Sequence, residues 1–409
     1  MRTITGPGQR VVVVGAGLAG LATALHLTGA GRDVVVVESR DRPGGCAGQL
    51  SVGGYTFDTG PTVITAPQLI DDALGAVGER RADRLELIRL DPAYRAFFAG
   101  GEQLDVHADP EDTAASIAAL AGDRAADGYR QFVGWTRALA DAQWRDFIDR
   151  NMDSPIALLR PSLARLLCLG GLRGLDAACR RYLPDERVRR AFTFQSLYAG
   201  LSPYDARAIY AVIAYLDTVG GVYFPRGGVH EIPRALAAAA GAHGVDLRYR
   251  TRVCNVIVDG DRATGVTTAA GERIAADAVV IAADLPAAYR ELLPRRVTPR
   301  RLRSVRASPS CVLLHVGSRG TDAGLAHHSI HFGAAWRQTF RELIDRRELM
   351  TDPSLLLGTP SQTDPQLAPP GRSSHYVLAP VPHLGAGLDW DVIGPRYRSE
   401  GVAKPEPSG

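Results

Sequence analysis

Three glycines near the N-terminus have the spacing of a phosphate-binding turn. They follow a run of four valines at 11–14 and precede a helix-like segment that extends to about residue 27. In such a turn the first glycine permits a tight bend, the second lets the backbone approach a pyrophosphate, and the third allows close helix–strand packing. The start of the helix also offers free N–H groups to an anion. The predicted phosphate-binding residues are Gly15, Ala16, Gly17, Leu18, Ala19 and Gly20.

An acidic residue follows at the position where a nucleotide ribose is bound. A second valine run, 34–37, reads as a buried strand and ends at Glu38. An acid about 20 residues after the glycine turn accepts hydrogen bonds from ribose hydroxyls. Because strand, turn, helix, strand and acid occur in this order, we favour a dinucleotide site over a glycine-rich turn without a ligand. We include the adjacent Ser39 and Arg40 in the predicted site.

Two further segments distinguish FAD from NAD. Gly44 and Gly45 can bring a second stretch of backbone against the pyrophosphate, and Arg42 can neutralise phosphate charge. The segment Gly60-Pro61-Thr62 would form a loop of small residues that passes close to a flat ring. Since an NAD-binding unit does not need this second clamp, the sequence favours FAD.

These segments resemble the bacterial phytoene desaturase family, which are FAD-dependent carotenoid desaturases. The similarity begins with ESRDRPGG at 38–45 and GYTFDTGPTVIT at 54–65, and it covers essentially the whole chain. The first motif indicates only the wider superfamily of flavin amine-oxidase-like proteins. GVYFPRGGV at 221–229 and SHYVLAPVPHLGAGLDW at 374–390 narrow the resemblance to the carotenoid branch.

The resemblance implies an α/β fold of amine-oxidase-like flavoprotein architecture. A discontinuous Rossmann-type FAD-binding domain would be accompanied by a substrate domain with a mixed β-sheet and by a helical lid. Val253 would contact the adenine through its backbone, and Asp284 lies just past a strand end, where ligands gather in open α/β sheets. The expected ranges are 1–75 and 221–285 for the FAD domain, 76–108 and 286–395 for the substrate domain, 109–220 for the lid, and 396–409 for a disordered tail.

The implied reaction is desaturation of phytoene or a related long isoprenoid, with hydride transfer to the flavin N5. No amino-acid side chain accepts a hydride, so a cofactor must do so. A membrane quinone or oxygen would then reoxidise the flavin. Family proposals place an acid three positions before an arginine of the lid; the arginine corresponds to Arg160, but the acid position is Ala157. We therefore name Arg160 as the candidate catalytic residue, with an ordinary interface arginine as the alternative.

One segment of the expected lid predicts contact with a membrane surface. Pro155–Leu175 is rich in leucine, carries three arginines and has no acid, as in amphipathic helices that lie in a lipid interface. A buried lid helix with solvated arginines is the alternative. We see no signal peptide and no run of about 18 apolar residues, so we expect a cytoplasmic protein bound peripherally to the inner face of the cell membrane.

Composition excludes several other classes. A net charge of +3 gives no argument for nucleic acid, and five scattered cysteines indicate neither a disulfide framework nor zinc. His327, His328 and His331 superficially suggest a metal cluster, but no further ligand has metal spacing, so we expect no metal. The family resemblance implies a strand or turn of the substrate domain there.

The end of the chain raises two alternatives to an active desaturase. Family members continue beyond 388–390 with a second glycine-rich FAD contact and a closing helix, whereas this chain ends in a polar tail. We therefore expect a C-terminally shortened chain, either inactive or completed by a partner chain that supplies this segment. The other alternative is an amine-oxidase-type flavin oxidoreductase with a different small-molecule substrate.

Overall fold

The structure is a computed structural model that describes residues 9–148, 155–300, 302, 305–320 and 324–397. Its chain divides into two compact units, one formed by 1–88 and 223–306 and the other by 89–222 and 307–409. The expected disordered tail lies outside the described residues from 398 onward. The domain boundaries inferred from the sequence stay a prediction, and the two units are described separately below.

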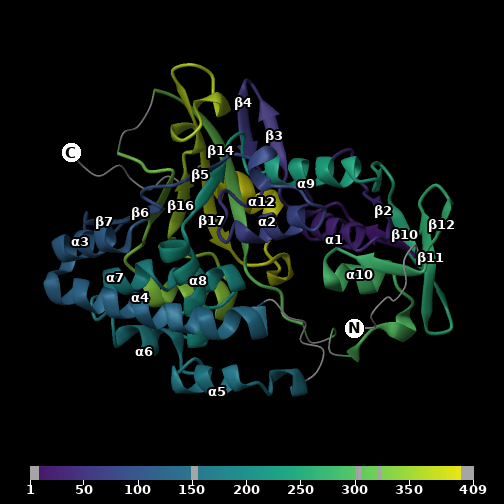
Figure 1. The fold of residues 1–409 in the computed structure, drawn as a ribbon. Coiled ribbons are helices and arrows are strands. Elements are labelled where there is room, and N and C mark those ends of the chain that lie inside the picture. The colour runs from purple at the N-terminus through teal and green to yellow at the C-terminus, as the bar shows by residue number, and fades with distance from the viewer. Residues whose placement is uncertain (1–8, 149–154, 301, 303–304, 321–323, 398–409) are drawn as a thin grey trace. The chain divides into compact units, whose positions relative to one another are not determined.

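The first unit is built on the βαβ element that the sequence predicts. Its parallel sheet has the strand order β13-β1-β2-β9, and helix α1 connects β1 to β2 (Figure 1). The two valine runs are fully buried, which suits strands covered on both faces. The bounds are β1 Arg10–Val14, α1 Leu18–Gly29, β2 Asp33–Val37, β9 Asp246–Arg248 and β13 Ala278–Ile281.

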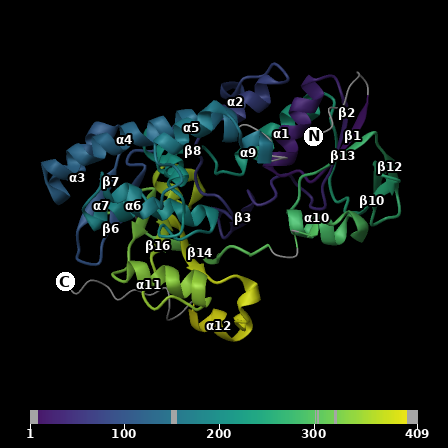
Figure 2. The ribbon, with the colours of Figure 1, turned by 90° about the horizontal axis from the view of Figure 1, so that it is seen from below.

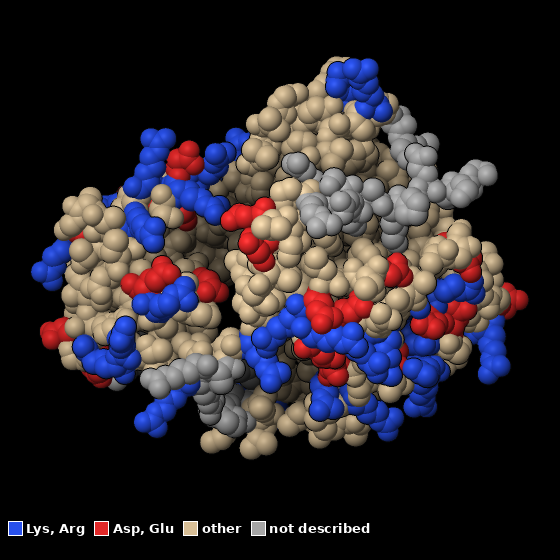
Figure 3. All heavy atoms as spheres, turned by 180° about the vertical axis from the view of Figure 1, so that it is seen from behind, with Lys and Arg blue, Asp and Glu red and all other residues tan. Residues whose placement is uncertain are grey.

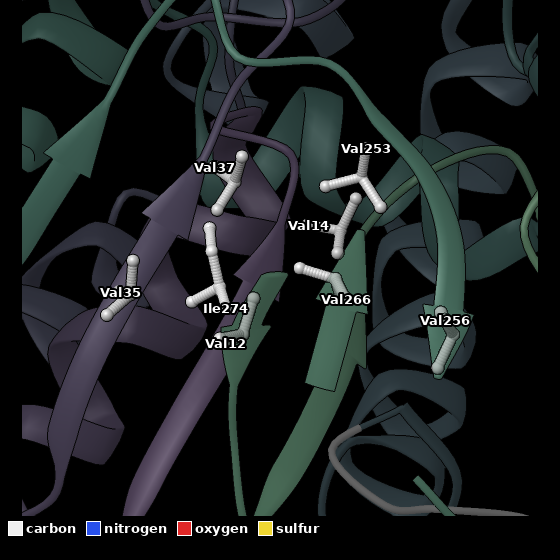
Figure 4. Packing of buried hydrophobic residues seen from close by; sticks show 8 residues of the cluster. All are labelled: Val12, Val14, Val35, Val37, Val253, Val256, Val266 and Ile274. Carbon is white, nitrogen blue, oxygen red and sulfur yellow. The ribbon is translucent and has the colours of Figure 1, made fainter. Parts of the chain in front are cut away.

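The alternation of side chains along the strands gives this sheet two different partners. Val12 and Val14, with Val35 and Val37, pack against an antiparallel meander of three strands (Figure 4). The opposite face is covered by α1, which packs beside helix α9 (Figure 2). The meander comprises β10 Val253–Asp259, β11 Arg262–Thr268 and β12 Arg273–Ala275, and α9 spans Glu231–Ala242.

The remaining elements of the first unit are short. A two-stranded hairpin follows the second glycine segment, and a helix begins directly after strand β13 at Asp284. The bounds are β3 Gln49–Val52, β4 Tyr55–Asp58, α2 Gln68–Gly75, β8 Tyr223–Pro225 and α10 Leu285–Glu291; β5, Leu87–Arg89, spans the boundary of the units.

The second unit contains a mixed six-stranded sheet with the order β14-β17-β16-β15-β6-β7. Every pair is antiparallel except β15 with β6. The histidine segment forms strand β15, as predicted, and burial lowers the pKa of His328 to about 4, which keeps its ring neutral. The bounds are β6 Tyr94–Phe97, β7 Gln103–Val106, β14 Ser310–Arg319, β15 His328–His331, β16 Leu355–Gly358 and β17 Arg372–Val381.

The described residues of the region 109–220 form helices and turns, as the sequence predicts. Asp109 caps helix α3 by accepting the N–H of Glu111 at 2.8 Å. In the long helix α4, Trp135 is buried and packs against the rings of Phe132 and Tyr182. The helices of the second unit are α3 Pro110–Ala121, α4 Asp123–Gln143, α5 Pro161–Cys168, α6 Leu175–Arg180, α7 Glu186–Ala191, α8 Ala211–Tyr215, α11 Trp336–Phe340 and α12 Trp390–Arg396.

The leucine-rich segment is broken into short pieces. A 3₁₀ turn spans Pro155–Leu158, and α5 starts at Pro161, where proline is favoured at the first helical position. Among the residues that the structure describes, every helix is too short or too polar to span a bilayer.

Candidate functional site

A groove of about 650 Å³ lies in the first unit, at the carboxyl ends of its parallel strands. This edge is where open α/β sheets bind ligands. Segments that are far apart in the sequence meet there, which brings most of the predicted cofactor residues together. The predicted residues that line the groove are Gly15, Gly17, Leu18, Ala19, Glu38, Ser39, Arg40, Gly44, Gly45, Pro61, Val253 and Asp284.

The glycine turn is tightly closed below the groove. The N–H of Gly15 donates to the Val37 carbonyl at 2.8 Å, which joins the turn to the second strand. A β-carbon at Gly20 would lie 1.9 Å from the Gly15 carbonyl oxygen, so this position accepts only glycine without a shift of the backbone. Ala16 is fully buried, and it and Gly20 form the turn rather than the groove wall.

The second glycine segment lies directly against this turn. The Gly44 N–H donates to the Ala16 carbonyl at 2.9 Å, and Gly17 and Gly44 form a parallel bridge. The Arg40 guanidinium donates to the Gly45 carbonyl at 2.8 Å and ties the segment to the end of β2. Glycine backbone from two segments therefore faces the groove, which is the arrangement that a diphosphate site requires.

Glu38 sits at the end of β2 with its carboxylate at the groove and only 7% of the residue exposed. One oxygen accepts the Ala16 N–H at 2.8 Å, and the other accepts the Arg40 N–H at 2.8 Å. These bonds fix the carboxylate at the base of the glycine turn. The Ser39 hydroxyl also donates to this carboxylate, at 3.0 Å. Because the two oxygens of a carboxylate accept about four hydrogen bonds, capacity remains for one from a ribose hydroxyl.

Besides Ala16 and Gly20, three predicted residues are not among those lining the groove: Arg42, Gly60 and Thr62. Arg42 lies on the surface and donates to the Asp41 carboxylate at 3.1 Å, a hydrogen bond that lowers the pKa of Asp41. Gly60 and Thr62 flank Pro61, which does line the groove. The phosphate-binding role of Arg42 stays a prediction, as does the ring-contacting role of the Gly60–Thr62 loop.

The opposite wall of the groove comes from the second segment of the unit. Val253 starts the meander, and Asp284 accepts the Ala287 N–H at 2.9 Å as the cap of α10. Sequence reasoning missed Thr251, Arg252 and the small pair Ala282-Ala283 beside them. The alanine pair directly follows strand β13. Small residues just after a predicted buried strand could therefore have identified these two positions as part of the groove wall.

The groove fits the nucleotide half of FAD. Gly17 is the N-cap residue of helix α1 and provides no side-chain cap, so the first N–H groups and the positive dipole end of the helix lie at the groove. The two glycine segments supply backbone that can approach the diphosphate. Glu38, at the usual sequence spacing from the glycine turn, supplies the acceptor for a ribose hydroxyl.

A second cavity, of about 430 Å³, lies wholly within the second unit. Ile330, Leu356 and Leu378 of the sheet line it, and Trp336 and Phe340 of α11 add aromatic rings that meet edge to face at 4.8 Å between centroids. None of its described lining residues is charged. The other lining residues are Phe194, Leu197, Tyr198, Pro309, Ser310, Cys311, Phe332, Thr339, Leu343, Met350, Ser354, Leu355 and Pro380.

Arg160, the candidate catalytic residue, is not among the residues lining this cavity. It is the N-cap residue of α5, and its guanidinium lies 3.7 Å from the Asp146 carboxylate. Asp153, the acid nearest in sequence, lies outside the described residues. A catalytic role for Arg160 stays a prediction.

The sequence of this chain matches one family of known proteins. The family model described as flavin containing amine oxidoreductase matches residues 18–384. A protein named phytoene dehydrogenase from Streptomyces griseus is 57% identical over 99% of this chain and 80% of its own length. A zeta-carotene-forming phytoene desaturase from Myxococcus xanthus is 36% identical over 97% of this chain and 77% of its own length.

Solved structures agree on the fold at low sequence identity. An oxidoreductase from Methanosarcina mazei has a TM-score of 0.62 at 17% identity, covering 96% of this chain and 82% of its own. A triple mutant of putrescine oxidase has a TM-score of 0.58 at 16% identity, covering 94% and 78%.

The chain belongs to the flavin-containing amine oxidoreductases, with the Rossmann-type α/β architecture of that class and FAD as its cofactor. Within this class it is a member of the phytoene desaturase family of carotenoid biosynthesis, which the resemblance of its sequence motifs predicts.

Proposed function

We propose that the protein is an FAD-dependent desaturase of phytoene or a related long isoprenoid. The observation that carries the proposal is the uncharged, apolar cavity of the second unit in a chain 57% identical to a phytoene dehydrogenase. A hydrocarbon offers no hydrogen bonds, so its binding relies on burial of apolar surface, which aliphatic and aromatic walls provide.

The lining of the cavity also separates this proposal from amine oxidation. An ammonium group that leaves water needs a carboxylate or an equivalent partner. The polar side-chain groups of the described lining residues are the hydroxyls of Ser310, Thr339, Ser354 and Tyr198, the thiol of Cys311 and the indole N–H of Trp336, with no carboxylate among them. A cationic substrate would find no carboxylate there and only aromatic faces to stabilise it, whereas an isoprenoid chain needs only the burial that the apolar walls provide.

The groove and the cavity have different roles in the proposed reaction. When bound, FAD supplies the hydride acceptor that no side chain offers, with a quinone or oxygen as the final electron acceptor. The glycine turn, the Gly44–Gly45 segment and Glu38 bind and orient the nucleotide. The apolar walls of the cavity hold the carbon chain and exclude water around it.

The test is conversion of phytoene by purified protein reconstituted with FAD. Phytoene is supplied in liposomes, and products are separated by chromatography and identified by the absorbance of the lengthened polyene. We expect products with additional conjugated double bonds that require FAD. Protein that binds FAD but leaves phytoene unchanged with both quinone and oxygen present would contradict the proposal.

We further propose that the segment 155–175 docks on an anionic membrane surface. Its side chains Ile156 and Leu159 are 77% and 75% exposed, and Leu167 and Leu172 about half exposed, at 52% and 50%. Arg160, Arg165 and Arg173 accompany them, which is the pairing of apolar insertion and lipid-headgroup attraction typical of interfacial segments. A substrate that is almost insoluble in water makes such contact necessary.

Flotation with vesicles tests this surface. The double variant Ile156→Ser/Leu159→Ser should lose most binding to vesicles that contain an anionic lipid. Leu384→Ser is the matched control, because Leu384 is 79% exposed on a different element of the same unit. Equal flotation of the double variant and the control would refute docking through this segment.

A further inference from the structure

The first unit contains a buried carboxylate, Asp58, that does not line the groove. Asp58 ends strand β4 and is 9% exposed. It accepts the N–H of Val229 at 2.9 Å and that of His230 at 3.3 Å, just before α9. Burial raises its pKa to about 6, and these two hydrogen bonds oppose that shift. Asp58 thus joins the TFDTG segment to the start of a 12-residue helix.

The histidine held in this way reaches the second glycine segment. His230 is 4% exposed, and its Nδ1 lies 2.7 Å from the Ala47 carbonyl oxygen. Because a carbonyl only accepts, Nδ1 carries the proton and donates it. A β-carbon at Gly44 would lie 3.0 Å from the imidazole, so the ring packs directly on this segment.

The glycine segment in turn rests on the phosphate-binding turn. The Ala47 N–H donates to the Gly44 carbonyl at 3.0 Å, and the Gly44 N–H donates to the Ala16 carbonyl at 2.9 Å. A continuous series of hydrogen bonds therefore connects Asp58, the start of α9, His230, the 44–47 segment and the glycine turn. Every member lies within the first unit.

We propose that Asp58 and His230 are positioning residues for the cofactor, which hold the 44–47 segment against the glycine turn so that both stretches of backbone face the diphosphate. Gln49 supports the same arrangement from β3, since its side-chain amide donates to the Gly227 carbonyl at 2.9 Å. The inference rests on the FAD site of the proposed function and is independent of the substrate. Neither side chain lines the groove, so their effect is exerted through the backbone of that segment.

The test compares two substitutions of His230 in the full chain. His230→Leu removes the donor to Ala47, whereas His230→Asn keeps an amide N–H near the Nδ1 position. FAD affinity is measured by quenching of flavin fluorescence, and stability by thermal unfolding of the FAD-free protein. We expect His230→Leu to weaken FAD binding about tenfold, the change expected for one lost hydrogen bond, and His230→Asn to stay within about threefold of wild type.

One further variant keeps the test informative if His230→Leu does not fold. Asp58→Asn retains one carbonyl acceptor for the two N–H groups and should also weaken FAD binding. His243→Leu is the control, because His243 caps the other end of α9 on the surface. Wild-type affinity in His230→Leu or in Asp58→Asn, or equal losses in His230→Leu and His230→Asn, would overturn the positioning role. Absence of FAD binding by the wild-type protein would instead refute the proposed function.

Discussion

Replacing Asp217 by asparagine should make the second unit more stable at neutral and higher pH. Asp217 lies in the helical turn after α8 and is only 8% exposed. Burial raises its pKa from the ordinary 3.8 to about 7, while a hydrogen bond from Gln195 acts in the opposite direction. The folded chain therefore holds a proton that the unfolded chain has released between pH 4 and pH 7, and stability falls across that interval.

The size of the effect follows from the difference in pKa. A rise from 3.8 to about 7 corresponds to about 4 kcal/mol, at ~1.4 kcal/mol for each pKa unit. An asparagine side chain at this position would keep the shape and a carbonyl acceptor without the charge. The Asp217→Asn variant should match the wild type near pH 4 and gain up to about 4 kcal/mol in unfolding free energy by pH 8.

Urea unfolding followed by tryptophan fluorescence measures this difference. All four tryptophans of the chain lie in the second unit, so the signal reports that unit. Asp205→Asn, at an exposed position of the same unit, is the control and should show no growing gain. A gain for Asp217→Asn that does not change between pH 4 and pH 8 would refute the assigned burial of an ionisable carboxyl.

Two further predictions concern the groove and the cavity. Gly20→Ala should weaken FAD binding and destabilise the first unit by about 1–3 kcal/mol, because its methyl group would overlap the Gly15 carbonyl. The control in the same FAD titration and thermal melt is Gly75→Ala, at a position with open space around it. Equal FAD affinity and equal stability of the two variants would contradict the tight turn. Cys311→Trp should reduce phytoene turnover several-fold by filling the cavity, without changing FAD affinity. Cys254→Trp, also at an exposed strand position, is the control and should leave turnover unchanged. Unchanged turnover in Cys311→Trp would exclude the cavity as the substrate site.

The nucleotide groove could be predicted from sequence because its determinants are local. Glycine spacing, two valine runs and Glu38 lie within about 30 residues, and each has a single structural interpretation in that order. The position of Val253 required the family resemblance, because its packing near the first strand depends on long-range contacts, whereas Asp284 followed from its place just past a strand end.

The apolar cavity could not be predicted in this way. Phe194, Ile330 and Leu378 come from separate parts of the chain, and each looks like an ordinary core residue in its own segment. Only the pairing of β15, β16 and β17 places the last two on one face. The link between Asp58 and His230 was hidden for the same reason, since 171 residues separate Asp58 from Val229.

Anaerobic reduction of the bound flavin by substrate tests the central claim most directly. Phytoene in liposomes is mixed with the FAD-loaded protein without oxygen or quinone, and flavin absorbance is followed, with putrescine as the comparison substrate. The account predicts that phytoene bleaches the flavin and putrescine does not. Bleaching by putrescine alone would identify an amine oxidase, and bleaching by neither would contradict a catalytically competent desaturase.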